Sequence, residues 1–374
     1  MASWAELIED KVFSEAADLA KLEASVVKST LRPLFLEARQ EMSQKLIEEW
    51  ELLSLQDRGR VRSFIITLTD LLEQSALEPI ERSVRPVLEN LAAGTYAQSA
   101  MEINTVLQVQ LLSTTAPPNF FAKVADRALI ENQPLLTSAR ADGSPSWWMS
   151  LRESERTRLA REIRKSLILG ESTQQATQRF TSKSGVLGVS SRNAESVVRT
   201  SIHSVTNAAR AEFYEDNQDV IDGVESIGTL DSRTTIVCRA YDGLKWSLPD
   251  YKPIGGHNKT HLPPPRHFRC RSVLIPVLSG LDAIDKKVRE MGMELEPTIR
   301  AAADGPRERR SIKGDMNGWL RSQSENKQNQ MLGIKRAELW RSRKIGLREL
   351  VDSQGEVLPI ESLEAKALQR SLPN

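Results

Sequence analysis

The chain has 374 residues, of which 51 are lysine or arginine and 50 are aspartate or glutamate, so its formal net charge is only +1. This balance gives no overall field that would draw the protein to nucleic acid or to a membrane surface. The length exceeds that of one typical core and fits two or three structural units. Two cysteines in the whole chain exclude a disulfide scaffold and are typical of a reducing compartment.

The N-terminal sequence MASWAELIEDKVFSEAADL is acidic and amphipathic. It lacks the basic start and the apolar middle of a signal peptide. No stretch approaches the roughly 18 consecutive apolar residues of a membrane-spanning helix. We therefore expect a protein that is made in the cytoplasm and has no membrane partner.

Residues 1–115 are predicted to form a helical block, because apolar residues recur at three- and four-residue steps in LIEDKVFSEAADLAKLEASVV and again in VRSFIITLTDLLEQSALEPIERSVRPVLENLAAG. Pro79 and Pro86 are expected to begin or kink helical turns, and Gly94 to end a helix. The first 60 residues carry 12 acidic and 8 basic side chains, net −4. This charge favours docking to another protein over binding to nucleic acid.

Residues 116–149 are predicted to be a linker and turn region, since two consecutive prolines and the turn sequence ADGSPS interrupt the helical pattern. A helix is then expected to open at Ser150, with a glutamate in capping-box spacing, and to end at Gly170. A short helix in STQQATQRFTSKSG and a long helix capped by Ser191 follow.

The periodicity changes after this long helix. The region contains short β-branched runs separated by Asp-Gly turns and by a loop rich in proline and glycine. GVESIGTL and RSVLIPVL are predicted to be strands, and DGLKWSL a strand or a hairpin arm. Residues 150–280 are therefore expected to form a small α+β module. The predicted fold class is mostly α with this one small α+β module.

Residues 281–374 are predicted to be a basic helical extension. From position 306 to position 348 the sequence has 12 lysines and arginines against 4 acidic residues. A charged helix is as often a solvated face as a binding surface, so both readings stay open. If packaged double-stranded DNA is a partner, the expected non-specific contacts are Arg307, Arg309, Arg310, Lys335, Arg336, Arg341, Arg343 and Lys344.

Zinc is one chemistry to weigh. The candidate ligands are Cys238, His257, His261, His267 and Cys270. His267 and Cys270 have an acceptable ligand spacing, but Cys238 has no second ligand near it, because Thr235 and Tyr241 occupy the positions that one would use. The sequence favours a pair of buried or hydrogen-bonded thiols and expects no cofactor, with structural zinc on Cys238, His267 and Cys270 as the less favoured alternative.

Nucleophilic catalysis by Cys270 with His267 is another alternative. Arg269 and Arg271 would lower the pKa of the thiol, but they fit a structural or anion-contacting role equally well. The sequence has no phosphate-binding loop, dinucleotide fingerprint or recognisable pair of catalytic carboxylates. We therefore expect that the protein is not an enzyme and has no catalytic residues.

Four pieces in a fixed order carry a resemblance. They are the helix VVRTSIHSVTNAARAEFYEDN, then Asp-x-x-Thr-x-x-x-Cys in DSRTTIVC, then an Asp-Gly turn followed by an aromatic residue, and finally Pro-x-His-x-x-Cys-Arg in PPPRHFRCRS. In this combination residues 150–280 resemble the phage Mu protein F-like domain of minor head, or head-morphogenesis, proteins of tailed phages. Its motif residues here are Asp231, Thr234, Cys238, Asp242, Gly243, Trp246, His267, Cys270 and Arg271.

The resemblance implies a low-copy virion component in the phage head, associated with the portal protein or the major capsid protein during procapsid assembly. Alternatives are a DNA-contacting packaging or ejection factor inside the head, and a metal- or thiol-dependent hydrolase centred on Cys270 and His267. Some members of the family carry additional cysteines where this chain has Thr235 and Ser272. The resemblance therefore offers no four-cysteine zinc site here, and Cys238, His267 and Cys270 are expected to pack together.

Overall fold

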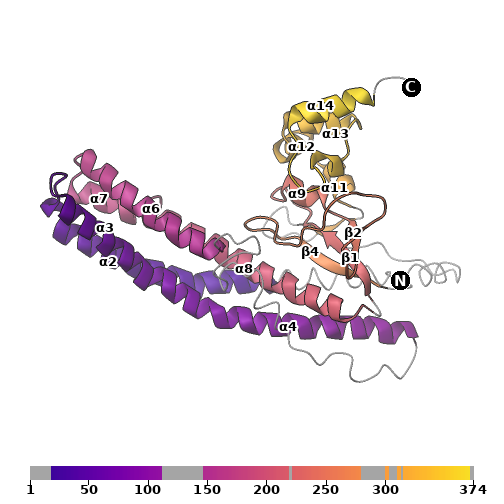
Figure 1. The fold of residues 1–374 in the computed structure, drawn as a ribbon, viewed down its shortest axis with the longest axis horizontal. Coiled ribbons are helices and arrows are strands. Elements are labelled where there is room, and N and C mark those ends of the chain that lie inside the picture. Colours follow the sequence, from indigo (N-terminus) through magenta and orange to yellow (C-terminus); the bar gives the residue numbers. More distant parts are fainter. Residues whose placement is uncertain are drawn as a thin grey trace. The chain divides into compact units, whose positions relative to one another are not determined.

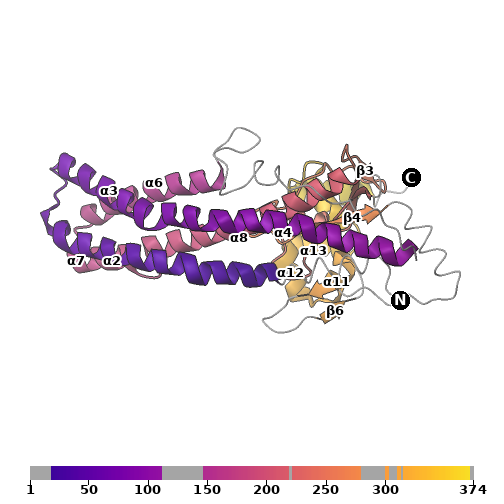
Figure 2. The same cartoon turned by 90° about the horizontal axis from the view of Figure 1, so that it is seen from below.

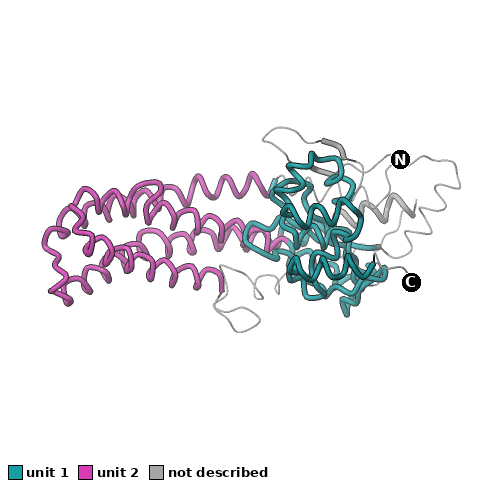
Figure 3. Tube along the Cα trace, turned by 90° about the horizontal axis from the view of Figure 1, so that it is seen from above, with its two compact units in different colours: residues 1–18, 94–125, 207–374 teal, residues 19–93, 126–206 magenta. Residues whose placement is uncertain are grey.

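The structure, a computed structural model, describes residues 18–111, 146–218, 221–278, 300–302, 310–312 and 315–370. It is mostly helical with a small four-stranded antiparallel sheet, which confirms the coarse fold class expected from the sequence. The chain divides into two compact units (Figure 3). The described parts of residues 19–93 and 126–206 are here called the helical unit, and those of residues 1–18, 94–125 and 207–374 the mixed unit.

The helical unit continues from helical residues 18–26. Its elements, some of which extend into the mixed unit, are η1 (Val27–Leu31), α2 (Arg32–Glu49), η2 (Trp50–Leu52), α3 (Arg58–Leu72), η3 (Glu73–Leu77), α4 (Glu78–Leu111), α6 (Trp147–Ile168), α7 (Thr173–Thr181) and α8 (Val186–Asp216). Helices α2, α3 and α6 lie side by side in two perpendicular views (Figures 1 and 2), and α3 contacts both of the others.

Buried apolar side chains at helical spacing form the core of the helical unit. Ala38, Met42 and Leu46 succeed one another at four-residue steps on α2, and each is fully buried. The Trp50 ring packs against Phe64 and Phe180, with ring centroids 6.3 Å and 6.2 Å away. These side chains repeat at helical spacing, so the packing follows directly from the periodicity of the sequence.

Three expected helix boundaries are wrong. The side chain of Ser146, not that of Ser150, caps α6 by accepting a hydrogen bond from the Met149 amide, and Ser191 lies inside α8. Helix α4 continues through Pro86 and Gly94. Buried apolar side chains on both sides of Pro86 keep that helix intact, since their packing outweighs the hydrogen bond that proline cannot donate.

In the mixed unit, the sheet is formed by β1 (Ile221–Ile227), β2 (Leu244–Ser247), β3 (Pro253–Ile254) and β4 (Val273–Leu278), in the order β3-β2-β1-β4. All its pairs are antiparallel, with Val224 opposite Trp246 on β2 and opposite Pro276 on β4. A separate pair is formed by β5 (Arg300–Ala302) and β6 (Arg310–Ile312). The predicted strand segments DGLKWSL and RSVLIPVL thus contain β2 and β4, and the segment GVESIGTL overlaps β1 but begins two residues after the start of β1.

Short helices complete the mixed unit. They are α9 (Ile236–Ala240), α11 (Met316–Ser322), α12 (Glu325–Leu332), α13 (Ile334–Arg341), η4 (Leu347–Leu350) and α14 (Ile360–Gln369). The helices after residue 315 share an apolar core that includes Trp319, Trp340 and Leu363, and Leu230 from the segment after β1 belongs to the same core. The described part of the C-terminal extension is therefore a packed element.

The two units do not coincide with the boundaries expected at residues 115, 149 and 280. Helices α6 and α7 and the first part of α8 share a core with α2 and α3, because their apolar faces at helical spacing are buried together. Residues 112–145 and 279–299, which include most of the expected linker, lie outside the described residues. Among the helices that are described, none combines the length and apolar character needed to cross a membrane.

Candidate functional site

The two cysteines of the chain lie in one buried cluster with a histidine. Cys238 is in α9, which begins after Thr235, and His267 and Cys270 are in the loop that leads into β4. The Cys238 Sγ lies 3.2 Å from His267 Nε2 and 3.6 Å from Cys270 Sγ. Thr235 Oγ1 lies 3.0 Å from the same Nε2. Cys238, His267 and Cys270 are here called the Cys-His-Cys cluster. The two sulfurs and the imidazole nitrogen of this cluster all lie within 4.8 Å of one another.

Hydrogen bonds inside the cluster separate the proton affinities of its members. The hydrogen bond from Cys270 holds the pKa of the Cys238 thiol well below its ordinary value, and the bond to His267 acts in the same direction, against the effect of burial. The same contact with Cys238, together with burial, raises the pKa of Cys270. The contact with Cys238 also raises the pKa of His267. Cys238 is therefore the sulfur that loses its proton first.

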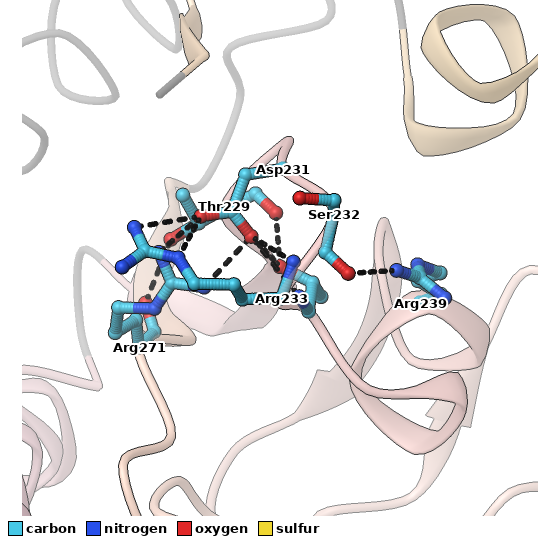
Figure 4. Close-up of polar contacts among 7 residues, drawn as sticks. Thr229, Asp231, Ser232, Arg233, Arg239 and Arg271 are labelled. Carbon is cyan, nitrogen blue, oxygen red and sulfur yellow. Dashed lines mark hydrogen bonds and ion pairs between the residues drawn. The ribbon is translucent and has the colours of Figure 1, made fainter. Parts of the chain in front are cut away.

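A second cluster surrounds the carboxylate of Asp231, whose side chain is fully buried (Figure 4). Both terminal nitrogens of Arg271 donate to the two carboxylate oxygens, one of them at 2.7 Å. The Thr234 backbone amide and hydroxyl each donate to Asp231 Oδ1 at 3.0 Å, and Arg233 contacts Oδ2 at 3.2 Å. Asp231, Arg271 and Thr234 are here called the Asp-Arg clamp.

Electrostatics favour an ionised carboxylate in the Asp-Arg clamp. Burial raises the pKa of Asp231, but the hydrogen bonds from Arg271 and Thr234 and the nearby arginine charges outweigh burial and hold this pKa below its ordinary value. A fork-shaped guanidinium pairs with a carboxylate through two parallel hydrogen bonds, which adds geometric specificity. The clamp therefore fixes the start of the DSRTTIVC segment against the end of the HFRCR segment.

The Asp-Gly turn forms a third point of attachment. Asp242 accepts hydrogen bonds from the Gly228 amide at 2.8 Å and from the Met316 amide at 3.1 Å. Gly243 has φ +72°, a left-handed conformation that favours glycine, and its amide donates to the Ser226 carbonyl at 2.8 Å. The next aromatic residue, Trp246, is fully buried and donates from Nε1 to the Lys259 carbonyl at 2.9 Å.

The structure separates the five candidate zinc ligands. His257 and His261 do not join the Cys-His-Cys cluster, because both pack edge-on against the Trp246 ring, with ring centroids 5.1 Å and 5.2 Å away. Burial lowers the pKa of His261 to about 4, with a smaller effect from Arg266 in the same direction. His267 is thus the histidine of this loop that faces the sulfurs.

The structure describes the side chains of five of the eight candidate DNA contacts. Arg336 donates to the Leu358 carbonyl at 3.0 Å, and Arg341 donates to Asn329 Oδ1 at 2.9 Å, so both have partners within the mixed unit. Lys335, Arg343 and Lys344 are exposed, and Lys335 lies 3.7 Å from Glu338. Arg307 and Arg309 lie outside the described residues, as does the side chain of Arg310.

Two buried cations of the mixed unit, Arg239 and Lys259, were not predicted from the sequence. Arg239 is 2% exposed, donates to the Ser232 carbonyl at 3.1 Å, and has a pKa lowered by burial to about 10 (Figure 4). Lys259 donates from Nζ to the Val351 and Asp352 carbonyls at 2.6 Å and 3.0 Å. No sequence signal marks a single lysine or arginine as buried, because its partners include backbone carbonyls, which every residue has.

Burial limits the access of a substrate to the two sulfurs. Cys238 and Cys270 are 2% and 0% exposed, so in this conformation a substrate atom has no direct approach to either sulfur. The His267 imidazole contacts the Cys238 sulfur, whereas the sequence pointed to Cys270 as its nucleophilic partner. The cluster thus brings α9 and the loop before β4 into contact.

Comparison of the chain with protein-family models, curated proteins and solved structures finds no match.

Proposed function

We propose that this chain is a minor head protein of a tailed phage, a low-copy structural component of the virion that acts in procapsid assembly. It is made in the host cytoplasm and is placed in the head by docking to the portal protein or to the inner capsid surface. We further propose that it acts without catalysis, as a protein that links other proteins.

One observation carries the proposal. The residues on which the resemblance to the Mu F-like domain rests are also the residues whose contacts join the segments around the sheet. Asp231 meets Arg271, Cys238 meets His267 and Cys270, and Asp242 holds the segments on either side of its turn. A chance similarity of sequence gives no reason for residues 29 to 40 positions apart to form one set of contacts, whereas a shared domain does.

Exposed apolar side chains in the N-terminal helices support docking to a protein. Leu36, Ile47 and Ile66 are 54%, 65% and 49% exposed, although each lies in a helix whose other face is buried. Interfaces bury such side chains on association.

Particle incorporation tests the proposal. The full chain is expressed with the portal and major capsid proteins of its own phage, and purified heads are analysed by quantitative mass spectrometry. We expect a few copies per head for the wild type and a loss of at least tenfold when Leu36, Ile47 and Ile66 are replaced by glutamate. Ile168→Glu with Leu169→Glu is the matched control, since these residues are 70% and 59% exposed in the same unit. Absence of the wild-type chain from purified heads would contradict the proposal.

The basic stretch favours contact with packaged DNA as a second candidate function. Phosphate contacts release counterions, so their affinity falls steeply with salt. Filter binding of double-stranded DNA at two salt concentrations, with and without Lys335→Ala, Arg343→Ala and Lys344→Ala together, tests it. Salt-sensitive binding that the triple variant weakens is expected under this alternative, and affinity that is independent of salt would exclude it.

A further inference from the structure

The Cys-His-Cys cluster brings two buried sulfurs together with a nitrogen of the half-buried His267 imidazole. Its members come from two segments about 30 residues apart, α9 and the loop before β4. Two of the donor atoms are sulfur and one is nitrogen, and all three face one another within 4.8 Å. Thiolate and imidazole are the ligands that zinc prefers in proteins.

The distances fit a single bound ion. Two sulfurs bonded to one tetrahedral zinc at ~2.3 Å lie ~3.8 Å apart, and a sulfur and a nitrogen lie ~3.6 Å apart. Cys238 Sγ and Cys270 Sγ lie 3.6 Å apart, and Cys238 Sγ and His267 Nε2 lie 3.2 Å apart. A disulfide, in contrast, would need the two sulfurs at ~2.05 Å. Placing an ion between the donors therefore needs shifts of only a few tenths of an ångström for these two pairs.

The orientation of the His267 ring is the one that a zinc ligand needs. Its Nδ1 lies 2.9 Å from the Phe268 carbonyl oxygen. A carbonyl only accepts hydrogen bonds, so Nδ1 carries the proton and Nε2 is the nitrogen directed at Cys238 Sγ. Zinc-binding histidines are held in this way, with the second ring nitrogen donating to a carbonyl or a carboxylate.

We propose that Cys238, Cys270 and His267 bind one zinc ion, with a water molecule as the fourth ligand. Both cysteines bind as thiolates, so binding displaces to the solvent the thiol protons that they still carry. The water would lie near the Thr235 hydroxyl, whose oxygen is 3.0 Å from Nε2. The ion would join α9 to the loop before β4, and this proposal is independent of the proposed function.

Metal content and spectroscopy test the zinc site. The untagged full chain, purified without chelators and dialysed, is analysed by inductively coupled plasma mass spectrometry. We expect about one zinc per chain in the wild type and in His257→Gln, and at least a tenfold lower content in His267→Gln and Cys270→Ser. Cobalt substituted for zinc is expected to give thiolate-to-metal charge-transfer absorption and the visible bands of a tetrahedral site. Unchanged zinc content in His267→Gln would overturn the ligand set.

A second measurement on the wild-type chain covers the case in which a variant fails to fold. The native protein is alkylated with iodoacetamide after incubation with zinc or with a chelator, and the modified peptides are quantified by mass spectrometry. We expect zinc to slow alkylation of Cys238 and Cys270 together by at least tenfold. Wild-type protein that contains no zinc, and whose two thiols react equally with and without added zinc, would overturn the proposal. A Cys238–Cys270 disulfide in the purified wild type would also overturn it.

Discussion

The helical unit and the mixed unit are stabilised in different ways. In the helical unit, apolar residues four positions apart, such as Ala38, Met42 and Leu46, are buried along continuous helices. Around the sheet of the mixed unit, buried Asp231 and Asp242 join segments that are far apart in the sequence. The comparison shows that apolar periodicity can specify a helix bundle. A small module with short strands depends instead on a few polar contacts, each of which contributes a larger share of the stability.

The largest effect should follow from breaking the Asp-Arg clamp. Asp231→Ala leaves the Arg271 guanidinium without its carboxylate, and breaking a buried ion pair in this way costs ~3–5 kcal/mol of unfolding free energy. Urea unfolding followed by tryptophan fluorescence measures the loss. Asp250→Ala is the matched control, because Asp250 pairs with Lys252 at 2.8 Å on the surface and its side chain is 59% exposed.

The clamp prediction also has a local readout. Hydrogen exchange should speed up in the peptides that contain Asp231 and Arg271. A loss below ~1 kcal/mol for Asp231→Ala, similar to that of an exposed pair, would show that the clamp does not stabilise the mixed unit.

A comparable truncation in the helical unit should act through packing alone. Leu68 is fully buried on α3, so Leu68→Ala removes apolar contacts and leaves a cavity, at a cost of ~2–5 kcal/mol. Ile66→Ala on the same helix is the control, since Ile66 is 49% exposed and should cost far less. Differential scanning calorimetry measures both. Equal losses in the two variants would contradict the assigned buried face of α3.

The two units should also differ in acid sensitivity. The pKa of Asp231 is held below its ordinary value, so its stabilising effect is complete above the unfolded pKa of ~3.9 and is lost as the pH falls through the lower pKa of the folded state. The stability difference between the wild type and Asp231→Asn should therefore shrink between about pH 5 and pH 2. Urea midpoints at each pH measure it. A difference that stays constant over this range would show that Asp231 has an ordinary pKa in the folded protein.

The smallest effect should come from the glycine inside α4. A Cβ atom at Gly94 would meet nothing within 4 Å apart from its chain neighbours and the nearby backbone of its own helix, and the residue lies within that helix. Gly94→Ala should therefore raise the unfolding free energy by ~0.5–1 kcal/mol, because alanine loses less backbone entropy in a helix. Thermal unfolding by circular dichroism measures the rise. A destabilised variant would show that helix α4 does not continue through this position.

Several helices and strands were predictable from the sequence, but their ends were not always. The apolar period indicated the helical residues of α3 and of the first part of α4, whereas Gly94, expected to end a helix, lies inside α4. Local signals such as these are weaker than burial over several turns.

For the candidate site, the motif pointed to its residues but not to their pairing. Cys238 contacts His267, and Asp231 contacts Arg271, across 29 and 40 positions of sequence. No local rule pairs residues at such separations. The buried Arg239 and Lys259 left no sequence signal, because their partners include backbone carbonyls, which every residue has.

The most direct test of the proposed function is to locate the chain in an intact particle by cryo-electron microscopy. The proposal predicts low-copy density in the phage head, next to the portal or the inner capsid surface, into which the helical unit and the mixed unit fit separately. Heads that contain portal and major capsid proteins but show no such density, and no peptides of this chain by mass spectrometry, would contradict it.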